Sequence, residues 1–254
     1  TGNYYFTELA KEYGVAPSSI RPLLNKRGLF SPSMDQIHRK HDLDEGFFEK
    51  IDTPEKAYIL GLFYADGCNA IENNKIAISL QNGDQKVLEK IRDMIQPTKP
   101  LYFRGPYKLK GKNGVEFNSK GHYTLAIISQ KICKDLERHG MAPRKSMKLA
   151  WPHWLKEDLI PHFVRGFFDG DGGISANGGI SFTANKEFLD DLLVVLNSRG
   201  LCPLNKIHKN CISDVFSFCF SAKKDVNSFY SWLYNENEGM FLDRKREKME
   251  KFVL

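Results

Sequence analysis

Two acidic residues, Asp66 and Asp171, stand at matching places in two similar stretches of the chain, residues 57–67 and 162–172. Each follows a largely apolar run and is itself followed by a glycine. Carboxylate oxygens are hard ligands of the kind that Mg²⁺ prefers, and a bound metal can activate water and stabilise the leaving oxygen of a phosphodiester. The pair therefore indicates metal-assisted phosphodiester cleavage, provided that the fold brings the two carboxylates together.

Small residues spaced four apart give each run a way to approach the other closely. The pairs are Gly61 with Ala65 in the first run and Gly166 with Gly170 in the second. Residues four apart share one face of an α-helix, so each run offers a strip with almost no side chains. Two such strips can pack backbone against backbone. We therefore expect both runs to be helices that pack closely and carry the two acidic residues to one end of the pair.

Local signals mark the ends of these helices. Thr53 followed by Pro54 is typical of a helix start, and Pro161 lies near the start of the second run. The glycines that follow the acids, Gly67 and Gly172, are expected to take the left-handed conformation that closes many helices. Two ordinary buried helices with Asp-Gly caps are the simpler interpretation, but caps alone do not account for the repeated strip of small residues.

The same order of elements follows each acidic run. A strand, an amphipathic helix, further strands and a closing helix are expected in both halves. This repeat predicts two similar halves of an α+β fold, related by a pseudo-two-fold axis at which the opening helices meet. The expected elements are a strand at 75–81, a helix at 86–95, two or three strands within 101–129 and a helix at 130–139, then 179–183, 186–198, 206–221 and 226–234.

Basic residues are concentrated in the strand regions, where aromatic residues such as Tyr102 and Tyr107 are interleaved with them. Cations among aromatics on a sheet are typical of a surface that binds nucleic acid, where lysines fix affinity rather than sequence. A solvated sheet face is the alternative. The predicted DNA contacts in these regions are Arg104, Lys108, Lys110, Lys112, Lys120, Lys206 and Lys209.

Residues 5–25 have the pattern of two short helices around a tight turn. Small Ala10, the turn residue Gly14 and apolar Ile20 have the spacing of a helix-turn-helix, whose second helix enters the major groove of DNA. Pro22 departs from that pattern because it removes a helical hydrogen bond. A helical hairpin that only packs on the rest of the chain is the alternative. On the DNA-binding interpretation, the basic contacts are Arg21, Lys26 and Arg27.

Composition narrows the class of protein. The 254 residues include 37 Lys and Arg against 31 Asp and Glu, a net charge of +6 that favours a polyanionic partner without requiring one. The five cysteines form no Cys-x-x-Cys pair and predict reduced thiols rather than disulfides or a zinc site. No apolar stretch reaches the length of a membrane span and no signal peptide opens the chain, so we expect an intracellular protein without membrane contact.

The two acidic runs, Tyr58 to Gly67 and Phe163 to Gly172, resemble the paired motif of the LAGLIDADG homing endonucleases. The resemblance covers residues 45–254 and includes the order of elements after each motif and the ending Leu242-Asp-Arg-Lys245. It implies two pseudo-symmetric αββαββα repeats that form a saddle over DNA. The expected boundaries are a helical extension at 1–35, a first repeat at 36–150 and a second repeat at 151–254.

By resemblance, the protein is a site-specific endonuclease that acts as a monomer on double-stranded DNA. Family members with two motifs in one chain cut both strands of a long asymmetric site across the minor groove and leave 3′ overhangs. They require a divalent metal, here Mg²⁺ with Mn²⁺ able to replace it. The last acid of each motif binds the metal, which assigns that role to Asp66 and Asp171, together with the adjoining Gly67 and Gly172.

The resemblance also assigns residues around the metal. The basic residue of the family's active site maps onto Lys245, and an alignment of the two halves makes Lys145 its counterpart. A surface position without a catalytic role is an equal alternative for Lys145. A polar strand residue that positions solvent in the family maps near Gln81 and Thr183.

One position departs from the family pattern. Tyr64 stands in the first motif where the second motif has the acidic Asp169. This position is not the metal ligand, so the departure leaves activity possible and is interpreted as packing at the helix end.

Two other functions fit parts of the pattern. A non-cleaving nucleic-acid binder, such as an RNA maturase or a transcription regulator, keeps the fold but has no need of two metal carboxylates. An intein is disfavoured because the chain begins with Thr1-Gly2 and ends with Val253-Leu254, without the residues of a splice junction. The endonuclease is therefore the preferred interpretation.

Overall fold

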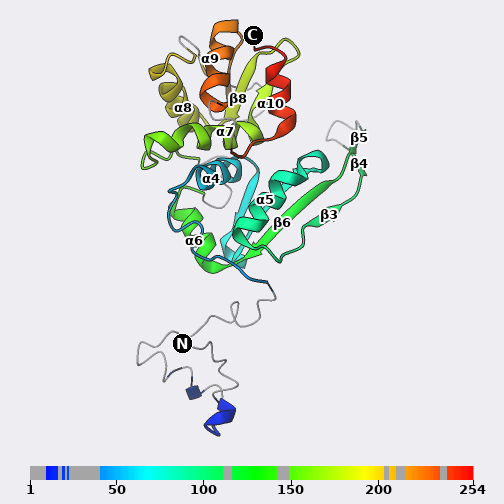
Figure 1. The fold of residues 1–254 in the computed structure, drawn as a ribbon, viewed down its shortest axis with the longest axis vertical. Coiled ribbons are helices and arrows are strands. Elements are labelled where there is room, and N and C mark those ends of the chain that lie inside the picture. Colours follow the sequence, from blue (N-terminus) through cyan, green and yellow to red (C-terminus); the bar gives the residue numbers. More distant parts are fainter. Residues whose placement is uncertain are drawn as a thin grey trace. The chain divides into compact units, whose positions relative to one another are not determined.

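The computed structural model describes residues 10–16, 19–20, 22, 41–110, 116–141, 149–202, 206–209, 215–234 and 239–253 (Figure 1). The chain divides into two compact units, Thr1–Asp42 and Leu43–Leu254. The second unit contains both acidic runs and every helix and strand that positions them.

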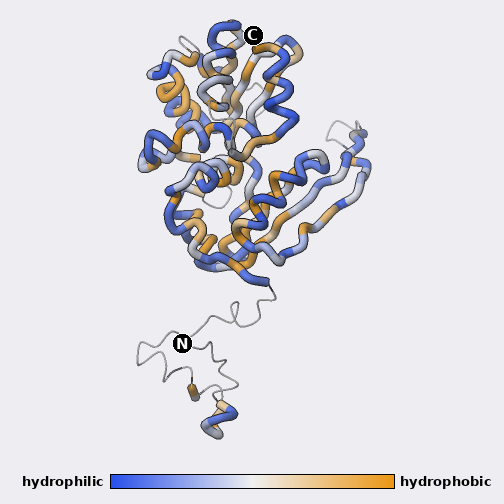
Figure 2. The backbone as a smooth tube through the Cα atoms, in the orientation of Figure 1, coloured by the Kyte–Doolittle hydropathy of each residue, from blue (hydrophilic) through white to orange (hydrophobic). Residues whose placement is uncertain are grey.

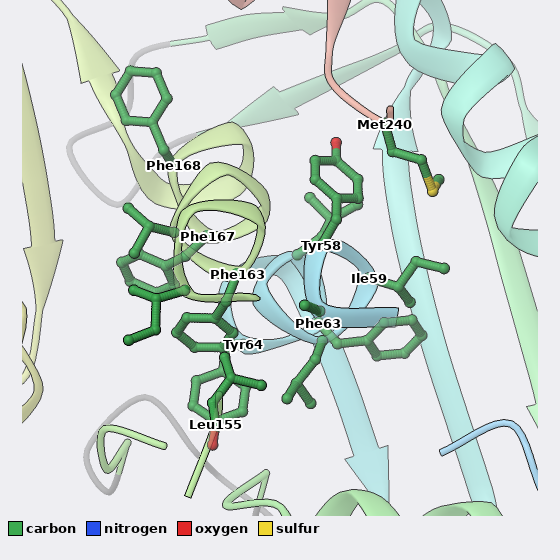
Figure 3. Packing of buried hydrophobic residues seen from close by; sticks show 14 of the residues in the cluster. Tyr58, Ile59, Phe63, Tyr64, Leu155, Phe163, Phe167, Phe168 and Met240 are labelled. Carbon is green, nitrogen blue, oxygen red and sulfur yellow. The ribbon is translucent and has the colours of Figure 1, made fainter. Parts of the chain in front are cut away.

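Two helices formed by the acidic runs lie at the centre of the second unit (Figures 1 and 3). Helix α4 (Pro54–Asp66) begins at Thr53, whose side chain accepts a hydrogen bond from the Lys56 amide at 3.3 Å. Helix α7 (Ile160–Asp171) follows a 3-10 turn, η4 (Glu157–Leu159), and has a proline in its first turn. The expected helices and their starts are confirmed.

The small-residue strips bring the backbones of α4 and α7 into direct contact. A Cβ atom added to Gly61 would lie 2.9 Å from the carbonyl carbon of Phe163, and one added to Gly166 would lie 2.9 Å from that of Tyr58. Real Cβ contacts are not that short, so neither position has room for a side chain. The predicted packing of backbone against backbone is therefore correct, and glycine is required for space at both crossings.

The expected left-handed ends of the two helices are wrong. Gly67 has φ −75° and ψ 153°, and Gly172 has φ −72° and ψ 147°, which is extended backbone that any residue adopts. The chain passes from each helix straight into a strand. Space again explains the glycines, because an added Cβ would lie 2.6 Å from the Phe63 carbonyl oxygen at Gly67 and 2.5 Å from that of Phe168 at Gly172.

Two four-stranded antiparallel sheets with the same strand order follow the two helices. In each sheet, the strand that continues the helix lies at one edge and pairs with the next strand in the chain. The last strand of the repeat comes next, and the third strand lies at the far edge, if the separate hairpin described below is left out of the count. This match confirms an α+β fold made of two related repeats. The first sheet is β1 (Gly67–Ala70), β2 (Lys75–Gln81), β6 (His122–Ile128) and β3 (Tyr102–Arg104); the second is β7 (Gly173–Ile174), β8 (Ile180–Ala184), β10 (Phe216–Phe220) and β9 (His208–Lys209).

Each sheet has one apolar face and one exposed face because its central strands alternate in character. In β8, Ile180 and Phe182 are buried while Thr183 is exposed, and β2 alternates in the same way. Phe182 and Phe218 stack across the second sheet with ring centroids 5.3 Å apart. Further helices complete the repeats: α5 (Gln85–Ile95) after the 3-10 turn η2 (Asn82–Asp84), α6 (Gln130–Arg138), α8 (Lys186–Ser198), α9 (Lys223–Tyr234) and the short α10 (Asp243–Glu250).

The basic strands of the first repeat form a separate hairpin. Strands β4 (Tyr107–Lys110) and β5 (Glu116–Ser119) pair only with each other, as a two-stranded sheet. The region 101–129 thus holds four strands, more than the two or three expected. The described part of the second repeat contains no counterpart of this hairpin.

The N-terminal unit is described only in part. Ala10 and Ile20 are buried, and Gly14 has φ +61°, which fits a turn between two short helical segments. The predicted contacts Arg21, Lys26 and Arg27 lie outside the described residues, so the helix-turn-helix stays a prediction. Where the chain is described, no helix is long and apolar enough to cross a membrane, and the four cysteines there are thiols rather than disulfides.

Candidate functional site

The two acidic residues meet at the ends of the central helices. Asp66 is the last residue of α4 and Asp171 the last residue of α7, and both are exposed. A Cβ atom added to Gly170 would lie 3.1 Å from the Asp66 Oδ2 atom, so the Asp66 carboxylate rests against the backbone of the opposite helix. Helix packing therefore gathers the two carboxylates at one place, as the sequence predicted.

Lys245 lies at the same place although it is far away in the chain. Its side chain is buried, with 6% of the residue exposed, and its Nζ atom donates to the carbonyl oxygens of Phe168 and Gly172. The bond to Gly172 measures 2.6 Å. Nζ also lies 4.9 Å from the centroid of the Phe168 ring. The ammonium group is thus fixed at the end of α7, where it contacts Gly172, the residue that follows Asp171.

Electrostatic interactions join the lysine to both acids. Burial lowers the pKa of Lys245 to about 8, and the neighbouring charges of Asp169, Asp66 and Asp171 oppose that change, while Arg244 adds to it. Lys245 bonds to the carbonyl of Gly172, which follows Asp171, and Asp66 rests against Gly170 of the same helix. Three of the predicted catalytic residues therefore lie at one end of the helix pair.

Both carboxylates sit where a helix disfavours negative charge. The C-terminal end of a helix carries a partial negative charge, which stabilises a cation and destabilises a carboxylate. Neither α4 nor α7, both described in full, has a basic residue in its last turn. Two carboxylates at two adjoining C-terminal ends concentrate negative charge that Lys245 neutralises only in part. A divalent cation suits such a site.

The donor set fits a metal that keeps part of its water. Among the described residues, no group of three or more His, Cys, Asp or Glu side chains is placed to hold a metal ion. The chain therefore offers two carboxylates with nearby backbone carbonyls, and Mg²⁺ usually takes one or two carboxylates together with water and phosphate oxygens. The carbonyl of Gly172 is engaged by Lys245, whereas Gly67 lies in β1 opposite Ile78.

Gln81 and Thr183 do not occupy equivalent places in the two sheets. The strand registers place Ser79, rather than Gln81, opposite the end of α4, just as Thr183 lies opposite the end of α7. Gln81 is two residues further along β2, and Ser79 Oγ forms a hydrogen bond of 2.7 Å with Thr124 Oγ1. The registers pair Cys68 with Ala77 and Gly173 with Ser181. Cys68 lies two residues after Asp66, and Gly173 lies two residues after Asp171. Ala77 therefore corresponds to Ser181, and Ser79 corresponds to Thr183.

The described cations among those predicted lie on the outer strands or just beside a strand, rather than in the middle of the sheets. Arg104 closes β3 and holds its guanidinium 4.0 Å from the centroid of the Tyr107 ring. Lys108 and Lys110 share one face of β4. Lys112 and Lys145 lie outside the described residues. All the predicted strand-region contacts that the structure describes are exposed: Arg104, Lys108, Lys110, Lys120, Lys206 and Lys209.

The exposed faces of the two main sheets carry polar groups that can form hydrogen bonds, with the cation Arg104 at the edge of the first sheet. In the first sheet, Gln81, His122 and Arg104 form one row across three strands. In the second sheet, Thr183, Ser217 and His208 form the corresponding kind of row. The sequence analysis had identified only part of each row, because strand pairing decides which residues become neighbours.

Asp169 keeps the earlier acidic position of the motif, which Tyr64 replaces in the first copy, and its contacts are specific. It is fully buried, and its Oδ2 atom accepts hydrogen bonds from the Tyr58 hydroxyl at 2.7 Å and the Leu242 amide at 2.8 Å. Burial raises the pKa of Asp169 to about 6. At the matching position in α4, the Tyr64 hydroxyl donates to the His139 carbonyl.

Proteins with similar sequences are known. Residues 53–99 match the model of the LAGLIDADG-like domain. The replication factor C small subunit of Methanocaldococcus jannaschii is 25% identical over 202 residues, which are 78% of this chain and 10% of that protein. This chain spans about a tenth of the length of the curated relatives it matches.

Solved structures share the fold at low sequence identity. The LAGLIDADG homing endonuclease I-GzeII, in complex with its DNA target, has a TM-score of 0.50 at 14% identity. The meganuclease I-SmaMI, bound to uncleavable DNA, has a TM-score of 0.50 at 11% identity. Each comparison covers 79% of this chain and 88% of the other.

Proposed function

Because residues 53–99 form a LAGLIDADG-like domain and the chain has the fold of the LAGLIDADG meganucleases, we propose that this protein is a site-specific DNA endonuclease. It cuts both strands of a long asymmetric double-stranded site and leaves 3′ overhangs. One observation carries the proposal: Asp66 rests against the helix that ends in Asp171, and the buried ammonium of Lys245 donates to the carbonyl of Gly172, the residue after Asp171.

The proposed chemistry is phosphodiester hydrolysis at the ends of α4 and α7. Asp66 and Asp171 would hold the cation, Mg²⁺ or Mn²⁺. When bound, a divalent cation lowers the pKa of its water and neutralises charge on the leaving oxygen. Lys245, fixed by two backbone carbonyls, presents its ammonium to the negative charge that develops on the phosphate. One acid from each repeat matches the two antiparallel strands of a duplex.

The exposed sheet faces are the proposed DNA surface. Phosphate contacts supply affinity, whereas hydrogen bonds to base edges supply sequence preference. Arg104, Lys108 and Lys110 lie toward the edge of the first repeat, where they suit phosphates, while rows such as Gln81 with His122 offer groups that can read bases. Both halves of the proposed site are in one chain, so we expect a monomer to be active.

Selection of cleaved sequences from a randomised DNA library, with Mg²⁺ present, tests the proposal directly. We expect enrichment of one long asymmetric site. Asp66→Asn and Asp171→Asn should each reduce cutting at that site by at least about a thousandfold, the scale of a lost catalytic group, while binding stays within a few-fold of wild type. Specific binding without cutting in either metal would instead identify a non-cleaving regulator or maturase, and full cutting by both variants would refute the metal assignment.

A further inference from the structure

Residues 240–245 are the coil that leads into α10 and the first turn of that helix, and together they are called the start of α10 here. This segment places Lys245 at the site but has little apolar surface of its own. Helix α10 has only eight residues, and only Lys245 and Met249 among them are buried. Its tube is coloured mainly hydrophilic in Figure 2. The N-cap residue, Leu242, makes no side-chain cap hydrogen bond. A helix this short is marginal without tertiary contacts, so contacts from other elements must fix its position.

Helix α7 provides two of these contacts from one face. Arg165 and Asp169 are one turn apart on α7 and both are buried, with 2% and 0% exposure. Arg165 Nε donates to the Met240 carbonyl at 2.9 Å, and Asp169 Oδ2 accepts from the Leu242 amide at 2.8 Å. Burial of an ionisable group is costly unless its bonds are well made, so both contacts constrain the backbone strongly.

The first repeat provides one further direct contact to this segment, from Asp84, and one contact that supports Asp169. The Tyr58 hydroxyl of α4 donates to the same Asp169 oxygen at 2.7 Å, and in Figure 3 its ring points from α4 toward the coil that carries Met240. Asp84, whose side chain is 3% exposed, accepts from Arg244 Nε at 2.9 Å with one oxygen and at 3.2 Å with the other. The start of α10 is therefore held from both repeats.

From this arrangement we infer that Asp169 and Asp84 are positioning residues that fix the start of α10 and thereby hold Lys245 in place at the end of α7. The Leu242 carbonyl accepts from the Lys245 amide at 3.0 Å, so the anchored residue and the lysine belong to one turn. Any effect of Asp169 and Asp84 on DNA cleavage rests on the proposed function. Their effect on the position of Lys245, called the hold on Lys245 below, does not.

Chemical labelling of lysines tests the hold without any need for catalysis. The folded full-length protein is treated with a trace of acetic anhydride, and modification of Lys245 is measured by mass spectrometry relative to exposed Lys251. Lys245 should be protected in the wild type. In Asp169→Leu and in Asp84→Ala, its labelling should rise by about tenfold, which is the scale expected when a buried bond to a charged group no longer opposes local opening.

Two further variants define the cause. Asp169→Asn keeps one oxygen for both hydrogen bonds and should label within about threefold of wild type, because neutral acceptors lose only part of a charged bond. Asp135→Asn is the matched control: Asp135 is a buried carboxylate paired with Lys131 at 2.8 Å on α6, away from α10, and its loss should not change Lys245 labelling.

Cleavage measured in single turnovers at saturating DNA then links the hold to function. Asp169→Leu and Asp84→Ala should slow cutting by about tenfold or more, with affinity for DNA unchanged, whereas Asp135→Asn should leave the rate as it is. If both variants, Asp169→Leu and Asp84→Ala, fold and Lys245 is still protected from labelling, the inference is wrong. A wild type that never cuts DNA overturns the proposed function alone, because the labelling result still decides the hold. Should Asp169→Leu fail to fold, Asp84→Ala and Tyr58→Phe carry the same test.

Discussion

At the scale of single residues, Asp66 and Asp171 occupy positions that favour metal binding over stability. Each carboxylate lies at the C-terminal end of a helix without a basic residue in the last turn, and the two helix ends adjoin. Repulsion between like charges and the unfavourable helix dipole both act against the folded state when no metal is bound. Residues that serve function in this way are expected to cost stability.

We predict that Asp66→Asn and Asp171→Asn each stabilise the metal-free protein while abolishing cleavage. The gain should be about 0.5–1 kcal/mol per substitution, the range for a charge at an exposed helix end. Thermal unfolding in the presence of a chelator measures it. Glu55→Gln is the matched control, because Glu55 lies in the first turn of α4, where a carboxylate is favourable, and its loss should lower stability. A lower unfolding temperature in both Asn variants would contradict this account.

Sequence reasoning found the residues whose roles follow from local pattern and missed those whose roles depend on distant partners. Asp66 and Asp171, identified from local pattern, lie at the adjoining ends of α4 and α7, and Lys245, assigned by resemblance, lies at the same end. Asp169 and Asp84 gained their roles only in the structure, since their partners Leu242 and Arg244 lie 73 and 160 residues away in the chain. No spacing rule connects residues across such distances.

At the scale of elements, the contact between α4 and α7 determines whether the acids meet. The strip of small residues was visible in the sequence, and the close crossing followed from it. The conformation after each acid was not predictable, because Asp-Gly at a helix end is compatible both with a left-handed cap and with direct entry into a strand. The sheet that each strand joins decided between them.

Gly61→Ala and Gly166→Ala should each separate the central helices. The added Cβ would overlap the backbone of the opposite helix, which cannot move aside as a flexible side chain does. We expect a loss of about 1–3 kcal/mol in the free energy of unfolding, typical of overpacking in a rigid core. Denaturant titration provides the measurement. Gly83→Ala is the control, since a Cβ there would meet nothing within 4 Å, and equal stability of all three variants would exclude the close crossing.

The end of α6 gives the first repeat a pH-sensitive contact. The His139 ring is buried, and its Nε2 atom lies 2.7 Å from the Phe48 carbonyl oxygen. The ring packs at a tilt of 36° against Trp154, with ring centroids 4.6 Å apart. Burial lowers the pKa of His139 below its ordinary value of 6.5. As the pH falls, His139 therefore takes up a proton in the unfolded chain before it does so in the folded protein. The contribution of neutral, buried His139 to the free energy of unfolding is complete above pH 6.5 and is lost below it.

We predict that stability declines less steeply below pH 6.5 in His139→Gln than in the wild type. Glutamine keeps a donor for the Phe48 carbonyl but does not titrate. Unfolding free energies measured at several pH values from neutral to mildly acidic compare the two proteins, and the difference between their curves removes the contribution of all other groups. Parallel curves would show that His139 has the same pKa in the folded and unfolded chain.

At the scale of the whole molecule, two repeats with the same strand order build one asymmetric protein. The repeat of elements was predictable because helix and strand periodicities recur in the same order. The separate β4–β5 hairpin was not, because its residues alternate in the same manner as those of the main sheet and only pairing partners distinguish them. Asymmetry of this kind suits a binding site whose two halves differ.

Removal of residues 1–42 should leave the rest of the molecule folded, because residues 43–254 form a compact unit with its own core. The shortened protein is expected to unfold at a temperature close to that of the full chain and to retain cutting activity. Its affinity for DNA should fall if the N-terminal helices contact the duplex, and unchanged affinity would assign them a packing role. Calorimetry and a binding titration on both proteins decide the two points separately.

Affinity for DNA should depend steeply on salt, with the hairpin cations responsible for part of the slope. Lys108 and Lys110 are exposed on one face of β4, and each phosphate that a lysine neutralises releases a condensed counterion. Replacing both by glutamine should reduce the slope of log affinity against log salt by about 1.8, or 0.9 for each lost contact. The preferred sequence should stay the same, because phosphate contacts do not read bases.

Lys186→Gln is the matched control for that titration. Lys186 is an exposed lysine on α8 that is paired with Asp190 at 2.7 Å, so it lies on a helix rather than on the proposed DNA-binding strands. Its loss lowers the net charge by one without removing a phosphate contact, and the salt slope should not change. An equal fall in slope for Lys186→Gln and Lys108→Gln would mean that overall charge, rather than the β4 strand, determines attraction to DNA.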